Sequence, residues 1–425
     1  MSPTPPVRAL SSRRRLLAAG VVVAAAAGMF ALWPRSLPGD AVLLSLAVGG
    51  TGDSAADASR MAIALARGRE TPRLLAASLW SAKAPSLSYD GRHMVFAGRR
   101  QASGPGALFT MRIDGAGLRE VTAGNGDPAD PAWLPDGRII YGDAAARGMA
   151  EAAGARALFA CAADGSAVTR LTWGGQRDAR PEVLLDGRVR FERRAAAGQE
   201  AAIVRMVVHP DGTGLAALPE GSAVPMAPIM GPGMIPGGRP PRRLDPPQGY
   251  TILATQTAAT RPRPPVLTSV VNASKTTGTL LCLDAYASRL PEIAALPRGV
   301  IDRVRVETVP PAAGASAAGA SADDAPAAAA APAVLGEAPV HADGSFFIEV
   351  PADTPLRLAL LARDGSILAR FDSGVWVRPN ENRGCIGCHE ASDRVPENRR
   401  PQAVDDPPVR LPSTLAMHGG RHGSR

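Results

Sequence analysis

Short runs that alternate apolar and polar residues, each beside an Asp-Gly dipeptide, recur through the first half of the chain. In one set the dipeptide precedes the run, at residues 88–96 (SYDGRHMVF), 134–141 (LPDGRIIY) and 184–191 (LLDGRVRF). In a second set it follows the run, at residues 108–115, 158–165 and 204–212. An Asp-Gly turn beside β-branched and aromatic residues is typical of a β-hairpin, so we predict antiparallel strands here.

The spacing of these turns predicts a β-propeller. Asp90, Asp136 and Asp186 of the first set lie 46 and 50 residues apart, and the second set repeats at nearly the same period. Periods of about 40–50 residues with two hairpins per unit are typical of four-stranded propeller blades.

One copy of the repeat carries a family resemblance. Residues 131–141 (PAWLPDGRIIY) resemble the repeat core of TolB-like propellers. We therefore assign a TolB-like β-propeller to residues 40–275, with a weak blade at 61–75 and a further blade expected near 250–271. Most propellers bind partners or act as scaffolds, so we predict that this half of the chain provides an interaction surface and not a catalytic centre.

The second half predicts a smaller β domain over residues 276–390. Its apolar runs are short and separated by further Asp-Gly turns, which favours a small β-sandwich. Residues 310–335 are rich in Ala, Ser, Pro and Gly, and we predict a disordered insertion there, as in the proline-rich tail 391–425. The predicted fold class is therefore all-β, a β-propeller followed by a small β-sandwich-like domain.

The N-terminus predicts export. Arg13, Arg14 and Arg15 precede an uncharged apolar run from Leu16 to Trp33. This pattern is typical of a signal peptide, and the run is also long enough for a membrane anchor, so residues 1–35 are one or the other. Either alternative places the rest of the chain in the periplasm or on the outer face of the inner membrane.

Composition narrows the functional classes. Gly 45 and Pro 40 agree with turn-rich β structure, and four cysteines in 425 residues are too few for a disulfide scaffold. The net charge is +8, but only Lys83 and Lys275 among the 47 basic residues are lysine. The arginines are spread along the chain and do not interleave with aromatic residues, so no nucleic-acid binding is predicted.

The strongest chemical signal is Cys385-Ile386-Gly387-Cys388-His389. Two cysteines with a two-residue spacer and an adjacent histidine form the attachment motif of c-type haem. We predict one covalent haem c, with thioether bonds from Cys385 and Cys388 and with His389 as axial iron ligand. A redox dithiol would need a βαβ unit, and a structural zinc site would need a second ligand pair nearby; the sequence around the motif shows neither.

The sixth iron position has several candidates. They are His341, Met417, His418 and His422, of which the last two fall in the predicted tail. An open sixth position is the alternative. Too few residues follow His389 for the helices of a small cytochrome c, so the haem is expected to pack against the preceding β structure.

The second half also carries a family resemblance in four ordered motifs. They are residues 281–286 (LCLDAY), 301–306 (IDRVRV), 336–346 (GEAPVHADGSF) and 378–390 (RPNENRGCIGCHE). These resemble the middle domain of the hydrazine synthase alpha-subunit-like family, which places a haem-bearing domain behind a β-propeller. The resemblance implies that architecture and a haem, and it implies less about the reaction.

Departures from that family bear on the site. In hydrazine synthase the motif histidine is understood to bind zinc, while a tyrosine four residues later ligates the iron; this chain has Asp393 there. Hydrazine synthesis is therefore disfavoured, and His389 is favoured as iron ligand. By analogy Cys282 would approach the haem site as a metal ligand, although its alternating strand context favours a buried small apolar residue.

Three functional hypotheses follow. The first is an exported c-type haem protein that transfers electrons, with the propeller binding an unidentified redox partner protein. The second is a haem redox enzyme, distantly related to the hydrazine synthase alpha subunit, with an open iron position. The third is an interaction or scaffold propeller whose haem is structural.

Overall fold

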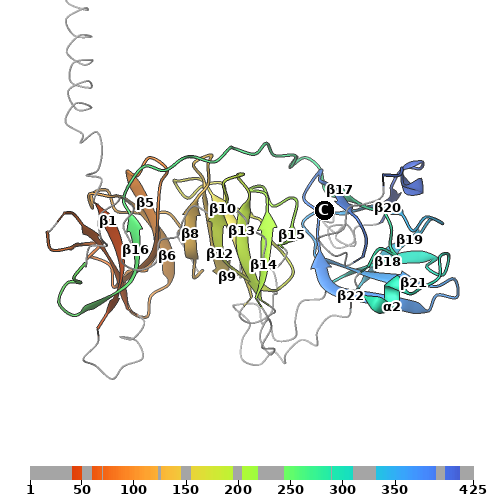
Figure 1. The fold of residues 1–425 in the computed structure, drawn as a ribbon, viewed down its shortest axis with the longest axis horizontal. Coiled ribbons are helices and arrows are strands. Elements are labelled where there is room, and N and C mark those ends of the chain that lie inside the picture. Colours follow the sequence, from red (N-terminus) through yellow and green to blue (C-terminus); the bar gives the residue numbers. More distant parts are fainter. Residues whose placement is uncertain are drawn as a thin grey trace, which may run out of the picture.

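The computed structural model describes residues 41–49, 60–68, 70–122, 126–144, 155–194, 203–218, 244–288, 290–309, 332–388 and 398–411. Its regular structure is nearly all β (Figure 1). The α-helix of the described chain is the short α2 (Pro291–Ala294). No helix in the described ranges is long and apolar enough to span a bilayer. The predicted signal peptide or anchor at 1–35 lies outside the described residues.

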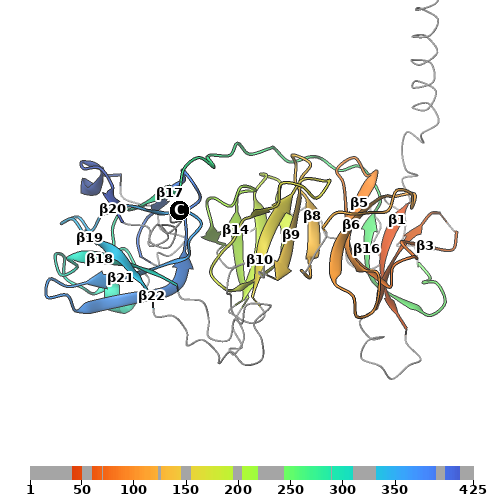
Figure 2. The same ribbon diagram turned by 180° about the vertical axis from the view of Figure 1, so that it is seen from behind.

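The first half forms four antiparallel four-stranded blades, which stand side by side in one row in both views (Figures 1 and 2). The first blade has the order β16 (Tyr250–Thr257), β1 (Val42–Val48), β2 (Met61–Ala66) and β3 (Arg73–Leu75). The second has β4 (Ser81–Leu87), β5 (His93–Arg99), β6 (Gly106–Arg112) and β7 (Arg119–Glu120).

The third and fourth blades share a single sheet. The third comprises β8 (Ala129–Trp133), β9 (Ile139–Ala144), β10 (Arg156–Cys161) and β11 (Thr169–Arg170). The fourth comprises β12 (Arg177–Val183), β13 (Val189–Arg194), β14 (Val204–Val208) and β15 (Ala216–Ala217). A parallel bridge between Arg156 and Arg177 joins the two blades into one continuous sheet.

The predicted Asp-Gly turns set the inner hairpins of the blades. In the turn before β9, the Asp136 carboxylate accepts the Arg138 N–H at 3.0 Å, and Gly137 has a φ of +92°. A carboxylate that binds the amide two residues ahead closes such a turn, and glycine tolerates the left-handed backbone. The turns at Asp90 and Asp186 are closed in the same way.

Strand β16 corrects the expected further blade near 250–271. It pairs antiparallel with β1 along its whole length, from Val42 opposite Thr257 to Val48 opposite Tyr250. The reason is hydrophobic: Tyr250 and Ile252 pack on the apolar cluster that β1 and β2 form with each other. The segment therefore completes the first blade.

The second domain is a pair of four-stranded sheets. One has the order β23 (Asn382–Cys385), β17 (Thr277–Cys282), β20 (Phe346–Pro351) and β24 (Val409–Arg410). The other has β19 (Val334–Pro339), β18 (Arg303–Thr308), β21 (Leu356–Leu361) and β22 (Ile367–Val375). Apolar residues of both sheets form one core cluster, so the predicted all-β class with a small β-sandwich-like second domain is confirmed.

Two segments predicted to be disordered contain ordered structure. Strand β19 begins inside 310–335, although residues 310–331 lie outside the described part. In the tail, residues 398–411 form the 3₁₀ turn η2 (Gln402–Val404) and β24. They are ordered because Ala403 and Leu411 are buried and β24 adds to the edge of β20.

The fourth blade packs directly on the second domain. Trp376, fully buried after β22, lies against Trp173 of the blade with ring centroids 5.7 Å apart. Arg193 stacks over the Trp376 ring at 5.3 Å and forms a buried ion pair with Asp178 at 2.7 Å. Aromatic and cation–π contacts of this kind stabilise the interface beyond its apolar area.

Candidate functional site

Strand β23 delivers the cysteine motif to the edge of a sheet. It runs parallel to β17, and the register places Cys385 opposite Cys282. The pairing continues past the strand, since Leu283 donates its N–H to the Cys385 carbonyl at 2.9 Å and Asp284 donates to Ile386 at 3.1 Å. The motif therefore lies along the segment that follows β17.

Gly387 brings the motif against the turn at residues 284–287. A β-carbon at this position would overlap the Ala287 carbonyl oxygen and lie 2.8 Å from the Asp284 carbonyl oxygen. Backbone atoms cannot move aside as the end of a side chain can, so the contact requires glycine. The close approach of the 284–287 turn therefore requires glycine at residue 387, in the spacer between the two motif cysteines.

Three of the four cysteines meet at this place. Cys282 and Cys388 are buried at 2% and 7% exposure, and Cys385 is partly exposed. A hydrogen bond with Cys388, together with burial, raises the pKa of Cys282 well above its ordinary value, so Cys282 is a neutral thiol at neutral pH. The fourth, Cys161, is buried in the core of the third blade.

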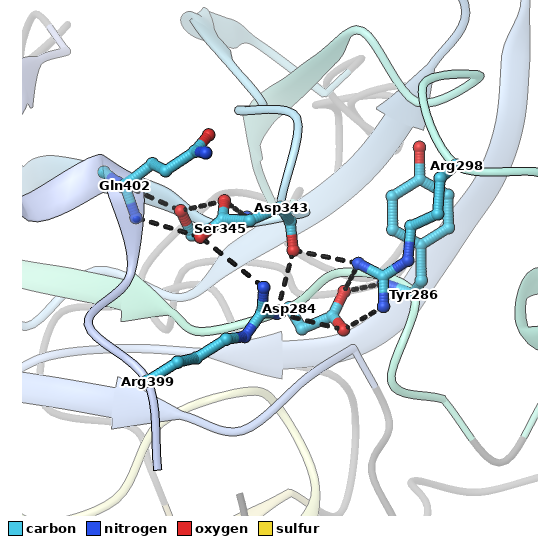
Figure 3. Close-up of polar contacts among 8 residues, drawn as sticks. Asp284, Tyr286, Arg298, Asp343, Ser345, Arg399 and Gln402 are labelled. Atoms are coloured by element: carbon cyan, nitrogen blue, oxygen red, sulfur yellow. Dashed lines mark hydrogen bonds and ion pairs between the residues drawn. The ribbon is translucent and has the colours of Figure 1, made fainter. Parts of the chain in front are cut away.

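A polar network holds the 284–287 turn (Figure 3). Arg298 donates two hydrogen bonds to the Asp284 carboxylate, at 3.0 and 2.6 Å, and its guanidinium lies 4.8 Å from the centre of the Tyr286 ring. The Tyr286 hydroxyl in turn accepts the Gly299 and Ile301 amides at 2.9 and 3.0 Å. Arg298 and the amides of Gly299 and Ile301 therefore hold Asp284 and Tyr286 of the turn in place.

The turn that contains His341, between β19 and β20, joins the same network. Its Gly344 carbonyl accepts the Ala285 N–H at 2.7 Å, and its Asp343 carboxylate accepts the Gln402 amide at 2.9 Å (Figure 3). Burial opposes the ionisation of Asp343, but hydrogen bonds from Ser345 and Gln402 and the charge of Arg399 outweigh it, so the pKa of Asp343 is lowered. The tail segment is thereby fastened to the His341 turn, and the His341 turn to the turn at residues 284–287.

The motif strand is also fastened to the fourth blade. Glu381, only 4% exposed, accepts the Gly214 amide at 3.0 Å with one carboxylate oxygen and the Arg378 amide at 2.7 Å with the other. Arg383 donates to the Leu215 carbonyl at 2.7 Å. The propeller therefore helps to position the strand that ends at Cys385.

Not every predicted site residue can be placed. Cys282, Cys385 and Cys388 come together, while His341 lies in a turn whose Gly344 and Asp343 contact Ala285 and Arg298. His389, Met417, His418 and His422 lie outside the described residues. Within the described ranges no group of three or more His, Cys, Asp or Glu side chains is arranged to hold a metal ion.

Sequence and structure comparisons agree on the relatives of this domain. Residues 299–390 match the hydrazine synthase alpha subunit middle domain. The structure resembles hydrazine synthase of Kuenenia stuttgartiensis with a TM-score of 0.69 and 14% identity, over 87% of this chain and 72% of that chain.

Weaker similarities each cover less than half of this chain. A TolB of Agrobacterium tumefaciens matches with a TM-score of 0.32 and 23% identity, over 37% of this chain and 56% of that chain. A puromycin-hydrolyzing peptidase of Mycobacterium tuberculosis matches with a TM-score of 0.32 and 15% identity, over 43% and 30%. No curated protein matches this sequence. Residues 299–390 therefore match the middle-domain family of the hydrazine synthase alpha subunit, and the chain shares the fold of hydrazine synthase over most of its length.

Proposed function

We propose that this protein carries one haem c, attached by thioether bonds from Cys385 and Cys388 with His389 as axial iron ligand, and that it transfers electrons outside the cytoplasm. The donor set supports this proposal, because two thiols with a two-residue spacer and a following histidine are the attachment chemistry of c-type haem. A bound haem would supply one-electron redox chemistry.

The placement of the two thiols is the observation that carries the proposal. Cys385 ends a strand whose register is set by β17, and Cys388 is turned inward against Cys282. Between them Gly387 is in contact with the 284–287 turn. Rigid backbone beside a covalent haem would keep the reorganisation of its surroundings small when the charge of the iron changes. A small reorganisation favours electron transfer.

The remaining parts of the chain fit the same proposal. Residues 1–35, as signal peptide or membrane anchor, would bring the protein to the periplasm or the outer face of the inner membrane, where haem attachment takes place. The four blades would bind the redox partner protein. His341 and Met417 are the proposed candidates for the sixth iron ligand.

The test is covalent haem incorporation in the full chain, produced in a bacterium that expresses a cytochrome c maturation system. The wild type should retain haem after denaturing electrophoresis and give a c-type pyridine haemochrome spectrum. The Cys385→Ser/Cys388→Ser variant should lose both signals. Cys161→Ser, which changes a buried cysteine of the third blade, is the matched control and should keep them.

The outcomes separate the alternatives. A wild-type protein without covalent haem, or a double variant that keeps it, would overturn the proposal. A six-coordinate low-spin spectrum supports an electron carrier, and its change in His341→Ala or Met417→Ala would identify the sixth ligand. A five-coordinate high-spin spectrum with ligand binding would instead indicate a haem redox enzyme.

A further inference from the structure

Three arginines stand in a row across neighbouring strands where the third and fourth blades meet. Arg156 on β10 is opposite Arg177 on β12, and Arg177 is opposite Arg194 on β13. These strands lie side by side in Figure 1. Residues directly opposite in an antiparallel pair have β-carbons about 4.5–5.5 Å apart, and like charges there are destabilising.

Neighbouring carboxylates compensate only part of this charge. Arg156 binds Asp127 at 3.0 Å, and Arg180 binds Glu192 at 3.3 Å. Asp178, next in the chain to Arg177, is engaged in its buried ion pair with Arg193. In the described part of the chain no carboxylate pairs with Arg177 or Arg194.

The same side chains line an open pocket at the surface, where Arg177, Arg180 and Arg194 are exposed. It has a volume of about 200 Å³ and is lined by Arg156, Arg177, Ala179, Arg180, Glu192 and Arg194; we call it the arginine pocket. Ala179 is opposite Glu192 in the pairing, so a small side chain leaves this part of the pocket open. The register of β12 and β13 then shifts between Ala179 and Glu182, where Arg180 has a φ of +53°.

That irregularity has a consequence for the pocket. A non-glycine residue with positive φ carries a conformational cost, and a β-bulge redirects a side chain away from the regular pleat. The same bulge with positive φ recurs at Ala84 of β4 and Asp130 of β8, so it is a general feature of the blades. In the fourth blade the residue at this position is a fourth arginine, at the rim of a pocket whose Arg177 and Arg194 have no carboxylate partner among the described residues. A bound anion would offset the repulsion among these arginines.

We propose that the arginine pocket binds a small multivalent oxyanion, of the phosphate or polycarboxylate class. Guanidinium groups match the planar oxygen pairs of such anions with two parallel hydrogen bonds, and they retain their charge at any physiological pH. A pocket of this volume admits an anion of the size of pyrophosphate or citrate. The site lies in the propeller, and the inference is independent of the haem proposal.

The test is thermal unfolding of the full chain at constant ionic strength, with sodium chloride replaced stepwise by pyrophosphate or by citrate. A ligand of the folded state raises the unfolding midpoint with saturation. The wild type should show such a rise with at least one of the two anions, and the comparison between them assigns phosphate or carboxylate chemistry. Calorimetric titration should show at least roughly tenfold weaker binding in Arg177→Ala/Arg194→Ala.

Two further variants keep the test decisive. Arg92→Ala/Arg363→Ala removes the same charge at two exposed arginines and should bind like the wild type. Arg177→Glu supplies an internal carboxylate opposite Arg194, so it should unfold at a higher temperature without added anion and lose the anion response. Equal midpoint shifts in the wild type and the Arg177→Ala/Arg194→Ala variant, or no shift in the wild type, would overturn the proposal.

Discussion

Gly387 and Ala287 are in backbone contact across the candidate site, with no room for a side chain between them. A β-carbon on Gly387 would overlap the Ala287 carbonyl oxygen, whereas one on Gly384, in β23 directly before the motif, would meet nothing within 4 Å. The two glycines therefore provide a matched pair for testing how closely the motif must approach the turn.

Gly387→Ala should destabilise the folded state by roughly 1–3 kcal/mol, because overpacking against backbone forces the motif away from the turn. Gly384→Ala should change the free energy of unfolding by less than this. Denaturant unfolding of both variants measures the difference. Equal stabilities for the two variants would show that the contact is not rigid.

Glu381→Ala should lower the free energy of unfolding by roughly 1–3 kcal/mol, because the buried Arg378 amide loses its acceptor and the exposed Gly214 loses its link to the motif strand. Glu120→Ala is the control: its ion pair with Arg100 is solvent-exposed, and exposed pairs contribute about 1 kcal/mol or less. If the two variants unfold alike in denaturant, the link between the motif strand and the fourth blade has no energetic role.

The attachment of the tail segment should weaken in acid. The pKa of Asp343 is lowered from its ordinary value of 3.8 in the folded protein, so its contribution to stability is complete above that value and is lost as the pH falls through the lowered pKa. The Gln402 amide, which donates to this carboxylate, should lose protection from hydrogen exchange in that range.

Asp343→Asn is the control for this pH dependence. The variant should show weak protection of the Gln402 amide already at neutral pH, with no further loss in acid that can be traced to residue 343. If the wild-type amide keeps its protection at a pH well below 3.8, another interaction holds the tail segment.

In the haem-free protein, Cys282 should react with an alkylating reagent more slowly than Cys385. The thiolate is the reactive form, and each pH unit below the pKa reduces its fraction about tenfold. Because the pKa of Cys282 is raised and its side chain is buried, we expect at least a roughly tenfold difference near neutral pH. Mass spectrometry of alkylated peptides measures it.

Denatured protein provides the reference for that measurement. Without the fold, the contact with Cys388 and the burial are both lost, so Cys282 and Cys385 should react at similar rates. Equal rates in the folded, haem-free protein would contradict the buried position of Cys282.

Much of the fold could be predicted from the sequence because it depends on contacts between residues that are close together along the chain. The carboxylates of Asp90, Asp136 and Asp186 close their turns with amides two residues ahead, so the signal and the structure it forms are adjacent in sequence. The alternating runs beside those turns then become strands β5, β9 and β13. The motif at Cys385 and Cys388 was visible for the same reason, since its spacing is local.

Pairing between distant segments could not be derived from the local sequence pattern. The approach of Cys282 to the motif was expected only by family analogy, because it depends on the parallel register of β17 with β23 across more than one hundred residues, to which the hydrogen bond from Thr279 to Asn382 also belongs. The row of Arg156, Arg177 and Arg194 likewise exists only once two blades share a sheet. The tail segment lacks periodicity because only a few of its residues, such as Ala403 and Leu411, reach the core.

The pairing of β16 with β1 has a consequence for the order of folding. Synthesis starts at the N-terminus, so β1, β2 and β3 are present long before Tyr250–Thr257, and the first blade is the last of the four to be completed. Contacts between such distant segments slow folding. Until β16 pairs with β1, the apolar strand Val42–Val48 is an open edge with which another chain can pair. A chain ending before Tyr250 would keep that edge permanently and should aggregate through it.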